Sequence, residues 1–538
     1  MIKKLRIIPL GGIEEVGKNC TVLEYGDDIV VIDLGIDFPG PDLPGIDHIL
    51  PDITYLEQNK ERIKGLVITH GHLDHIGAIS YYLHKIGNPP IFTTPLTWGL
   101  ISDRLSEVGL GRGINPNLMK PNQGFSLGVF KITPFRVVHN IPDSLGLIIE
   151  TPVGIIVHTG DFKIDDNPDD QKPLHKEKLK EWSKKGVLAL MSDSTNATLP
   201  GHSVPEKQVG RIIEQIIKDA PKRIIFTTFS SLISRIQQIV RACEKQGKKI
   251  ALVGMSMQKT VRIAQRLGYL NIPPGMLVDH KEVNKYADQE ILILSAGAQG
   301  VEGSSMARIS ENKHWSIRIK KGDTVVFSSS AVPGNELAIT SMMDGLVNQG
   351  AKIIYRSVLG SGVHSSGHAF QDELKEMIRL VRPKFFIPTE GQHYMHASHI
   401  ELAKSLGIKE ENCFMLYNGQ TLELDQYQAR ILKKKLPSLF IAVEGNQIRV
   451  LDKDAVRSRN KIAETGVCFI SIAQKKVQLV FHGLTVDNRV VEEIKKKARK
   501  LVERYGKKKN AKNKIKTSLS DFILNRTGKK PLVILIIN

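Results

Sequence analysis

Short apolar runs, each broken by glycine, proline or aspartate, make up most of the first 201 residues. Runs of this kind are typical of β-strands, and few segments between them have the apolar spacing of a long helix. The pattern therefore predicts one layered α/β unit, in which polar side chains at the strand ends meet in a cleft. The expected strands are residues 5–9, 21–24, 29–34, 66–69, 130–139, 146–150, 154–158 and 187–191.

From about Pro205 to Arg356 the pattern changes, because segments with helical apolar spacing alternate with short apolar runs. Such alternation is typical of βαβ units and of a mostly parallel sheet. We therefore expect a second domain here. Its expected helices are residues 206–220, 232–244 and 336–348, and its expected strands are 223–227, 250–253, 291–294 and 324–327.

The first pattern then resumes, with an expected helix at 371–380 and a strand at 383–388. Three lysines followed by Leu436-Pro437 indicate a linker. After short strands within 438–474, a strand at 477–481, helices at 491–505 and 518–525 and a closing strand at 531–538 predict a small α+β domain. The expected segments are 1–204 and 357–426, which form one split domain, the insertion 205–356, the linker 427–440 and the C-terminal domain 441–538.

The composition of the chain predicts a type of binding partner and a cellular compartment. Lysine and arginine exceed aspartate and glutamate by 75 − 56 = 19, which favours a polyanionic partner such as nucleic acid. Four widely spaced cysteines without a CxxC pair favour a reducing cytosol over a disulfide framework. Neither terminal apolar run is long enough for a signal sequence or a membrane span. We therefore expect a cytoplasmic protein with no membrane contact.

Four ligand-type side chains lie close together in the segment Thr69–His75. The apolar run before it and the small residues after it predict a strand-to-helix corner. His70 and His72, two apart on extended chain, can turn toward one metal ion. Asp74 and His75, beyond the bend, can face a second ion. The alternative, a polar loop in which histidines gather by chance, is uncommon at this density.

Further polar side chains follow later strands. Asp33 ends one strand and could orient a metal-bound histidine through its second nitrogen, although it could equally open a turn. His139 follows another strand, where a single histidine is usually structural. A role of His139 as a metal ligand gains support because Asp161 ends a strand soon after. A carboxylate can bridge two metal ions about 3.5–4 Å apart. Asp193 adds one more acid just past an apolar run.

Two loops could bind an anion. The turn Pro333–Glu336 feeds a helix N-terminus. The run Ser365-Ser366-Gly367 lies between His364 and His368, ahead of the expected helix, and offers hydroxyl and backbone N–H groups to a phosphate. The alternative for this second loop is a tight turn with a serine cap.

The order of these motifs resembles that of ribonuclease J, a metallo-β-lactamase enzyme with a β-CASP insertion. The similarity runs nearly end to end. It implies an α/β fold, namely an αββα sandwich with an inserted β-CASP α/β domain and a small C-terminal α+β domain. The segments that carry the resemblance are 10–19, the HxHxDH cluster at 70–75, 139–144, 160–162, 192–196, 333–336, 364–369 and 527–531.

The resemblance implies two zinc ions. The first would be held by His70, His72, His139 and Asp161, and the second by Asp74, His75 and Asp161. A family histidine that completes the second site aligns here with Glu390, which is the main departure from the pattern. A carboxylate can also ligate zinc, so the second site could survive, with manganese or magnesium as alternative ions. A weakened second site, or substitution by His393, are the other outcomes.

The family's remaining pair aligns with Asp193 and His368, where the acid would orient the histidine that protonates the leaving 3′ oxygen. Asp74 would help to place the attacking water, and residues 364–368 would hold a 5′ phosphate. The family cleaves RNA exonucleolytically, from 5′ to 3′, and endonucleolytically, in mRNA decay and rRNA maturation, and its C-terminal domain supports dimers or higher homo-oligomers. The lysines 507–509 could contact RNA or form a solvated face.

Three other functions stay open at this point. A small-molecule hydrolase of the same superfamily is disfavoured by the insertion and the basic surplus. An inactive paralogue that serves as a subunit of an RNA-decay complex is disfavoured by the complete 70–75 cluster, although Glu390 keeps it open. A DNA nuclease would use the same residues.

Overall fold

The computed structural model describes residues 4–40, 42–111, 113–169, 172–329, 331, 334–355, 362–473, 476–505 and 510–537. Pro333 of the predicted turn, the predicted boundary at 356/357 and the lysines 507–509 lie outside these residues. The chain divides into two compact units. One comprises Met1–Asp37 and Ile49–Leu439, and the other comprises Phe38–His48 and Phe440–Asn538.

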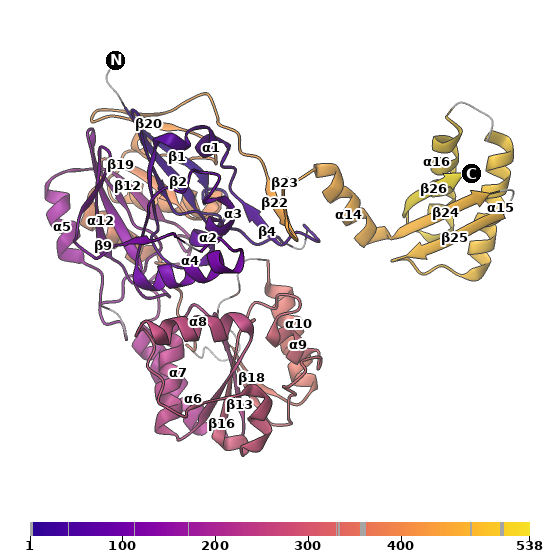
Figure 1. The fold of residues 1–538 in the computed structure, drawn as a ribbon, viewed down its shortest axis with the longest axis horizontal. Helices are drawn as coiled ribbons and strands as arrows, with labels where there is room; N and C mark the ends of the chain where they lie inside the picture. The colour runs from indigo at the N-terminus through magenta and orange to yellow at the C-terminus, as the bar shows by residue number, and fades with distance from the viewer. Residues whose placement is uncertain are drawn as a thin grey trace. The chain divides into compact units, whose positions relative to one another are not determined.

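Two sheets pack face to face in the first unit (Figure 1). The first sheet has the order β21-β20-β1-β2-β3-β5-β6-β7 and the second β19-β12-β11-β10-β9-β8. The first comprises β1 (Leu5–Gly11), β2 (Cys20–Tyr25), β3 (Asp28–Ile32), β5 (Ile63–Val67), β6 (Ile91–Thr93), β7 (Pro116–Leu118), β20 (Leu422–Leu424) and β21 (Ala429–Ile431). The second comprises β8 (Phe125–Leu127), β9 (Phe130–Arg136), β10 (Leu145–Thr151), β11 (Gly154–His158), β12 (Val187–Asp193) and β19 (Phe385–Thr389).

Apolar side chains from both sheets form the core between them, because alternate residues of each strand point inward. The outer face of the second sheet packs on α5 (Lys176–Lys184), α12 (Gln371–Val381) and α13 (His393–Ser405). Along the first sheet the chain forms α1 (Thr54–Gln58), α2 (Leu73–Ile76), α3 (Ile79–Tyr82) and α4 (Pro95–Glu107), with a 3₁₀ turn at Lys60–Arg62. A second 3₁₀ turn, at Glu410–Asn412, lies next to β19, and the short strand β4 (His48–Leu50) belongs to a separate three-stranded sheet. The architecture is the predicted αββα sandwich.

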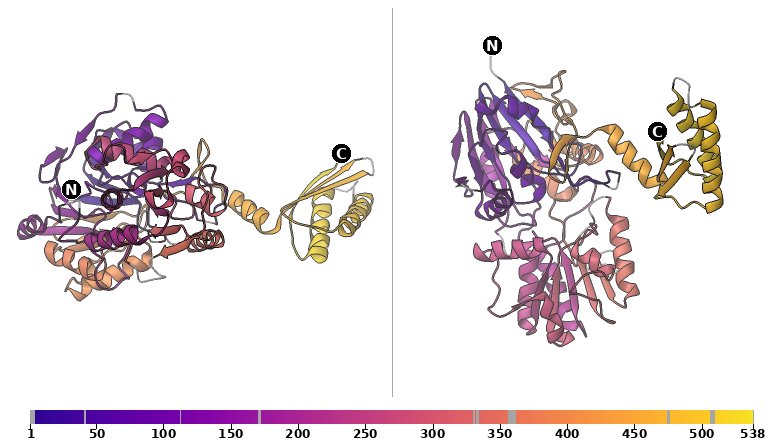
Figure 2. Two further views of the ribbon diagram at one scale, coloured as in Figure 1. Left: turned by 90° about the horizontal axis from the view of Figure 1, so that it is seen from below. Right: turned by 45° about the vertical axis from the view of Figure 1, so that its right-hand side comes forward.

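The insertion is a six-stranded parallel sheet in the order β15-β14-β16-β13-β17-β18. Its central strands β13, β16 and β17 are buried along their whole length because helices cover both faces (Figure 2). The strands are β13 (Ile224–Thr228), β14 (Lys249–Val253), β15 (Leu277–Val278), β16 (Ile291–Ser295), β17 (Thr324–Ser328) and β18 (Lys352–Tyr355). The helices are α6 (Glu206–Asp219), α7 (Ile233–Lys245) and α8 (Met255–Arg266) on one face, α9 (Ser305–Ser310) and α10 (Glu336–Asn348) on the other, with 3₁₀ turns at His280–Lys285 and Asp288–Glu290.

The second unit contains the hairpin β22 (Ile441–Glu444) and β23 (Gln447–Val450), followed by α14 (Lys453–Thr465). A sheet in the order β25-β24-β26 follows, formed by β25 (Lys476–His482), β24 (Val467–Ala473) and β26 (Leu532–Ile537). The helices α15 (Asn488–Tyr505) and α16 (Ala511–Thr527) pack on one face of this sheet. No helix among the described residues is long and apolar enough to cross a bilayer.

The expected strands of the first 201 residues are confirmed within three residues at each end. One prediction was wrong, because α14 occupies part of the stretch 438–474 that was expected to hold short strands. The first 201 residues contain few long helices, as predicted, and α4 is the longest of them. α4 lacks a clear periodicity because both sandwich and insertion cover it. A Cβ at Gly99 would lie 2.7 Å from Ile263 of α8. The domain boundaries stay predictions, and β21 lies within the expected linker.

A buried ion cluster at the start of α6 predicts acid lability. Glu206 Oε1 lies 3.0 Å from Lys163 Nζ, and its Oε2 lies 2.8 Å from Arg235 Nη2. Burial raises the pKa of Glu206, but the two cations outweigh it and lower the pKa to about 2, from an ordinary 4.5. Glu206 therefore stabilises the fold fully above pH 4.5, and this contribution is lost as the pH falls from 4.5 toward 2.

We expect Glu206→Gln to lower the free energy of unfolding at neutral pH. We also expect the slope of that free energy against pH, between about pH 5 and 3, to be smaller than in wild type. The difference in slope should correspond to the uptake of up to one proton on unfolding. Denaturant titrations at each pH measure both effects. Glu214→Gln, at an exposed pair with Lys245 (2.8 Å), should keep the wild-type slope. Equal slopes in wild type and Glu206→Gln would contradict the prediction.

Candidate functional site

The segment Thr69–His75 lies at a strand-to-helix corner, as predicted, between β5 and α2. The turn packs against the end of β3 so closely that a Cβ at Gly35 would lie 1.5 Å from the carbonyl oxygen of Asp74. That oxygen accepts a hydrogen bond from the Asn19 backbone N–H (2.9 Å). The backbone of the corner is therefore held from two sides.

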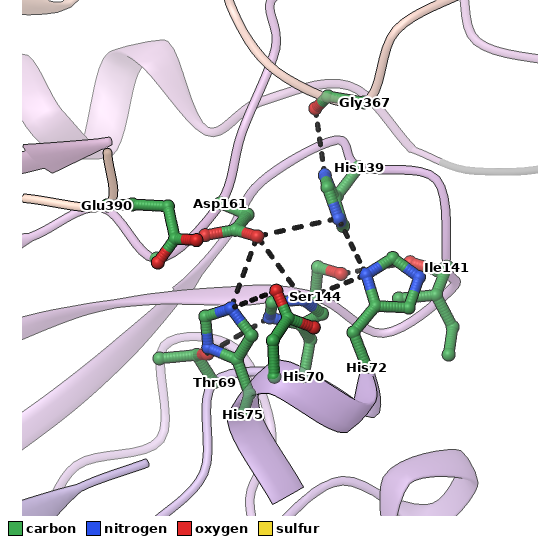
Figure 3. Close-up of polar contacts among 12 residues, drawn as sticks. Thr69, His70, His72, His75, His139, Ile141, Ser144, Asp161, Gly367 and Glu390 are labelled. Atoms are coloured by element: carbon green, nitrogen blue, oxygen red, sulfur yellow. Dashed lines mark hydrogen bonds and ion pairs between the residues drawn. The ribbon is translucent and has the colours of Figure 1, made fainter. Parts of the chain in front are cut away.

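One group of donors consists of three imidazoles and a carboxylate (Figure 3). His72 Nδ1 lies 3.2 Å from His70 Nε2 and 3.0 Å from His139 Nε2. Asp161 Oδ2 lies 3.5 Å from His70 Nε2 and 3.7 Å from His139 Nε2. All four donor atoms thus face one small space, which is the arrangement that a tetrahedral metal ion requires.

A second group of donors lies next to Asp161. Asp74, His75 and Glu390 offer donor atoms that lie within 4.8 Å of one another. His75 Nε2 lies 3.2 Å from Asp161 Oδ2 and 3.6 Å from Asp74 Oδ2. Asp161 Oδ2 therefore lies within 3.7 Å of histidine nitrogens of both groups, and its role as a bridge between two metal ions stays a prediction.

Glu390 follows β19 in the left-handed backbone region (φ 49°). Its Oε1 accepts a hydrogen bond from the Gly17 N–H (3.0 Å), whereas its Oε2 is buried and accepts none. The other alternative from the sequence, His393, lies outside both groups and packs its ring on Tyr417, with centroids 4.5 Å apart. Among the described residues, the position expected for a histidine is thus filled by a buried carboxylate.

The ionisation of these groups fits a bound cation. Burial, reinforced by neighbouring histidines, lowers the pKa of His70 and His139 well below the ordinary value, so both keep a free lone pair at neutral pH. Burial and the charge of Asp161 raise the pKa of Glu390 well above its ordinary value. Asp161 Oδ2 is likewise buried and accepts no hydrogen bond. Divalent cations would offset this crowding of carboxylates, so the residues present fit two metal ions.

Hydrogen bonds orient two of the imidazoles from behind. His75 Nδ1 donates to Asp33 Oδ2 (2.8 Å), and the Thr69 backbone N–H donates to Asp33 Oδ1 (2.8 Å). His139 Nδ1 donates to the Gly367 carbonyl oxygen (2.8 Å). Both contacts leave Nε2 facing the donor groups, as carboxylates and carbonyls do behind metal-bound histidines.

Asp193, at the end of β12, faces His368 from the other side of the site. Its Oδ2 lies 2.8 Å from His368 Nδ1. Burial lowers the pKa of His368, but Asp193 raises it more, to about 9. The imidazole is therefore held in one orientation and can carry a proton at neutral pH.

The loop 364–368 lies beside the first donor group. It approaches so closely that a Cβ at Gly367 would lie 2.6 Å from the His139 ring, which only glycine permits. His364 and Ser365 are each 1% exposed, whereas Ser366 and His368 are half-buried. Only part of the loop therefore offers side chains to a ligand.

Sequence reasoning missed three polar residues that hold this loop. Asn196 Nδ2 donates to Ser366 Oγ (2.7 Å), and Lys163 Nζ donates to Ser365 Oγ (2.9 Å). Arg235 Nη1 donates to the Val363 carbonyl oxygen (2.7 Å). Asn196 lay within a recognised motif, but nothing in the local pattern distinguished Lys163 or Arg235 from other cations on a basic chain.

The fold and the two donor groups define a hydrolase of the metallo-β-lactamase class with an inserted domain. Family models agree with this. Residues 13–202 match the metallo-beta-lactamase superfamily and 361–416 the Zn-dependent metallo-hydrolase RNA specificity domain. Residues 221–346 match the ribonuclease J beta-CASP domain, and 454–538 match the ribonuclease J C-terminal domain.

Relatives narrow the class further. The chain is 40% identical to ribonuclease J of Synechocystis, over 88% of this chain and 73% of that protein. It is 35% identical to ribonuclease J of Thermus thermophilus (98% and 94% covered) and 32% identical to ribonuclease J2 of Bacillus subtilis (99% and 98%). The chain belongs to the ribonuclease J family. A crystal structure of a protein of unknown function from Enterococcus faecalis shares the fold, with a TM-score of 0.53 at 15% identity, over 78% of this chain and all of that one.

Proposed function

We propose that this protein is a metal-dependent ribonuclease of the cytoplasm that degrades RNA from a 5′-monophosphorylated end, in the 5′-to-3′ direction, and also cuts internally, in mRNA decay and rRNA maturation. The observation that carries the proposal is the pair of donor groups joined at Asp161 beside the loop 364–368. Two metal sites next to an anion-binding loop suit hydrolysis of a phosphodiester held by a neighbouring phosphate.

His70, His72, His139 and Asp161 would hold the first ion. Asp74, His75 and Glu390 would hold the second, with Asp161 shared. Bound divalent ions would supply an activated water and stabilise negative charge on the phosphoryl oxygens. The first set is rich in nitrogen and suits zinc. The second is rich in carboxylate oxygen because of Glu390, which admits manganese or magnesium as well.

The protein's own groups perform the remaining steps. Asp74, at the open side of the second donor group, orients the attacking water. His368, held by Asp193, donates a proton to the leaving 3′ oxygen. Ser366 Oγ and the backbone N–H groups of the loop hold the upstream phosphate, supported by His364, Ser365 and Gly367.

A second candidate function rests on Glu390. If this carboxylate leaves the second site unfilled, the protein would be a weakly active subunit of an RNA-decay assembly. The buried, unpaired Oε2 favours a filled site, because an unneutralised carboxylate at that position would be costly. A DNA nuclease would use the same groups, so substrate chemistry has to be tested directly.

The decisive assay gives the purified protein RNA and DNA of one sequence, each with a 5′ monophosphate, triphosphate or hydroxyl. We expect mononucleotide release, fastest from 5′-monophosphorylated RNA. His72→Ala and Asp161→Ala should abolish it, and His368→Ala should slow it about 10²–10⁴-fold, the usual contribution of a general acid. His202→Ala, at an exposed histidine, is the matched control. Equal rates in wild type and all variants, or preference for DNA, would refute the proposal.

Metal content tests the role of Glu390. Glu390→Ala should reduce the bound metal from two ions to one per chain, because the second donor group loses a carboxylate. Mass spectrometry of the desalted protein measures this content without reference to activity. His393→Ala, three residues away and outside both groups, should keep two ions. Two ions in Glu390→Ala would remove Glu390 from the ligands.

Self-association is proposed for the C-terminal domain. Its sheet packs helices on one face only, and the opposite face exposes apolar side chains on neighbouring strands. Phe469 of β24 pairs with Val480 of β25 and with Ile534 of β26. An exposed patch of apolar side chains of this kind suits a second copy of itself across a twofold axis.

We expect the full chain to sediment as a dimer or larger oligomer, and Phe469→Lys combined with Ile534→Lys to yield monomers, because two buried ammonium groups would face each other. Leu337→Lys, at an exposed leucine of the insertion, is the matched control and should not change the mass. Analytical ultracentrifugation measures all three proteins. A wild-type monomer, or a double variant with wild-type mass, would contradict the proposal.

A further inference from the structure

Three charged side chains are buried together where the insertion joins the sandwich. Lys163 and Arg235 are 0% exposed and Glu206 is 7% exposed. Glu206 bridges the two cations through its two oxygens, at 3.0 and 2.8 Å. We refer to these residues as the Lys163–Glu206–Arg235 cluster. Nothing in the proposed chemistry uses it directly.

Besides the hydrogen bonds that Arg235 donates to Gln238 and Ser328, the cluster makes contacts at one loop. Lys163 Nζ donates to Ser365 Oγ (2.9 Å), and Ser365 Oγ in turn donates to the Val204 carbonyl oxygen (2.5 Å). Arg235 Nη1 donates to the Val363 carbonyl oxygen (2.7 Å), which also accepts from Ser328 Oγ (2.7 Å). The cluster therefore contacts Ser365 within the loop 364–368 and Val363 just before it, on either side of His364.

The three residues of the cluster come from different parts of the chain. Lys163 lies two residues after Asp161, so one short segment carries both the shared carboxylate and the ammonium that holds the loop. Glu206 is the first residue of α6, and Arg235 lies in α7, so both come from the insertion. The loop, the metal-binding segment and the insertion thus meet in one set of directional contacts.

Packing alone does not explain such a cluster. Burial of two cations and a carboxylate carries a large desolvation cost, and apolar side chains of similar volume would fill the space at least as stably. Apolar side chains could not, however, fix a hydroxyl and a carbonyl in position. The contacts that distinguish the cluster from an apolar filling are those to Ser365 and Val363.

We propose that the Lys163–Glu206–Arg235 cluster positions the loop 364–368, through Ser365 and Val363, and thereby sets the preference for a 5′ monophosphate. This inference rests on the proposed function. The three residues of the cluster are positioning residues, because the loop lies between them and the substrate. Ser366 and His368 remain the side chains that meet the phosphate, and their placement depends on the buried contacts behind them.

The test compares kcat and KM for RNA with a 5′ monophosphate and RNA with a 5′ hydroxyl. In Lys163→Met we expect the ratio of the two kcat/KM values to fall about tenfold, mainly through a higher KM for the monophosphorylated RNA, since a charge-assisted hydrogen bond to the loop is lost. Titration calorimetry with a nucleoside 5′-monophosphate should show a loss of affinity of the same size. Lys176→Met, at a partly exposed lysine paired with Asp166 and Glu376, should keep the wild-type ratio.

A double-mutant cycle separates positioning from general destabilisation. If Lys163 acts through Ser365, Lys163→Met combined with Ser365→Ala should lower the ratio no further than Lys163→Met alone. Additive effects, or a wild-type ratio in Lys163→Met, would overturn the inference. If Lys163→Met does not fold, Ser365→Ala alone decides, and a wild-type ratio there overturns it. A wild-type protein that cleaves RNA without any 5′ preference would instead refute the phosphate site itself.

Discussion

One oxygen atom, Asp161 Oδ2, lies within 3.7 Å of the Nε2 atoms of three histidines, which come from two separate corners of the chain. A second and a third carboxylate, Asp74 and Glu390, lie beside it. Such crowding of acids is unfavourable in a buried space unless cations are present. The rest of the structure provides the rigid frame that holds these groups together despite their repulsion.

The site residues are held in place because several strands of the two sheets end beside the site. β3, β5, β11, β12 and β19 end next to Asp33, His70, Asp161, Asp193 and Glu390 respectively. Because paired strands have a fixed spacing, the side chains that follow their ends are placed to within a narrow range without any ligand. β19 joins this edge only after the chain has returned from the insertion, and it pairs in parallel with β12. The residues before and after the insertion therefore contribute to the same site, although the insertion separates them in the sequence.

Much of the fold could be predicted because its signals are local. Apolar runs located the strands, and helical spacing located α6, α7 and α10 to within about a residue at each end. The apolar pattern did not locate α4. α4 has no clean apolar stripe because its second face is covered by α8, which follows some 150 residues later in the chain. Apolar periodicity identifies a helix that is buried on one face. It does not identify a helix whose second face is buried by a segment far away in the chain.

By itself the sequence determined which side chains of metal-ligand type follow the strands, because strand ends and ligand-type residues can both be recognised from neighbouring residues. Only the tertiary structure decided which of them meet. It brought Glu390 rather than His393 to Asp161, buried Ser365 while leaving Ser366 half-buried, and set Lys163 behind the loop. Burial and hydrogen-bond partners depend on segments far apart in the chain, so no local pattern contains them.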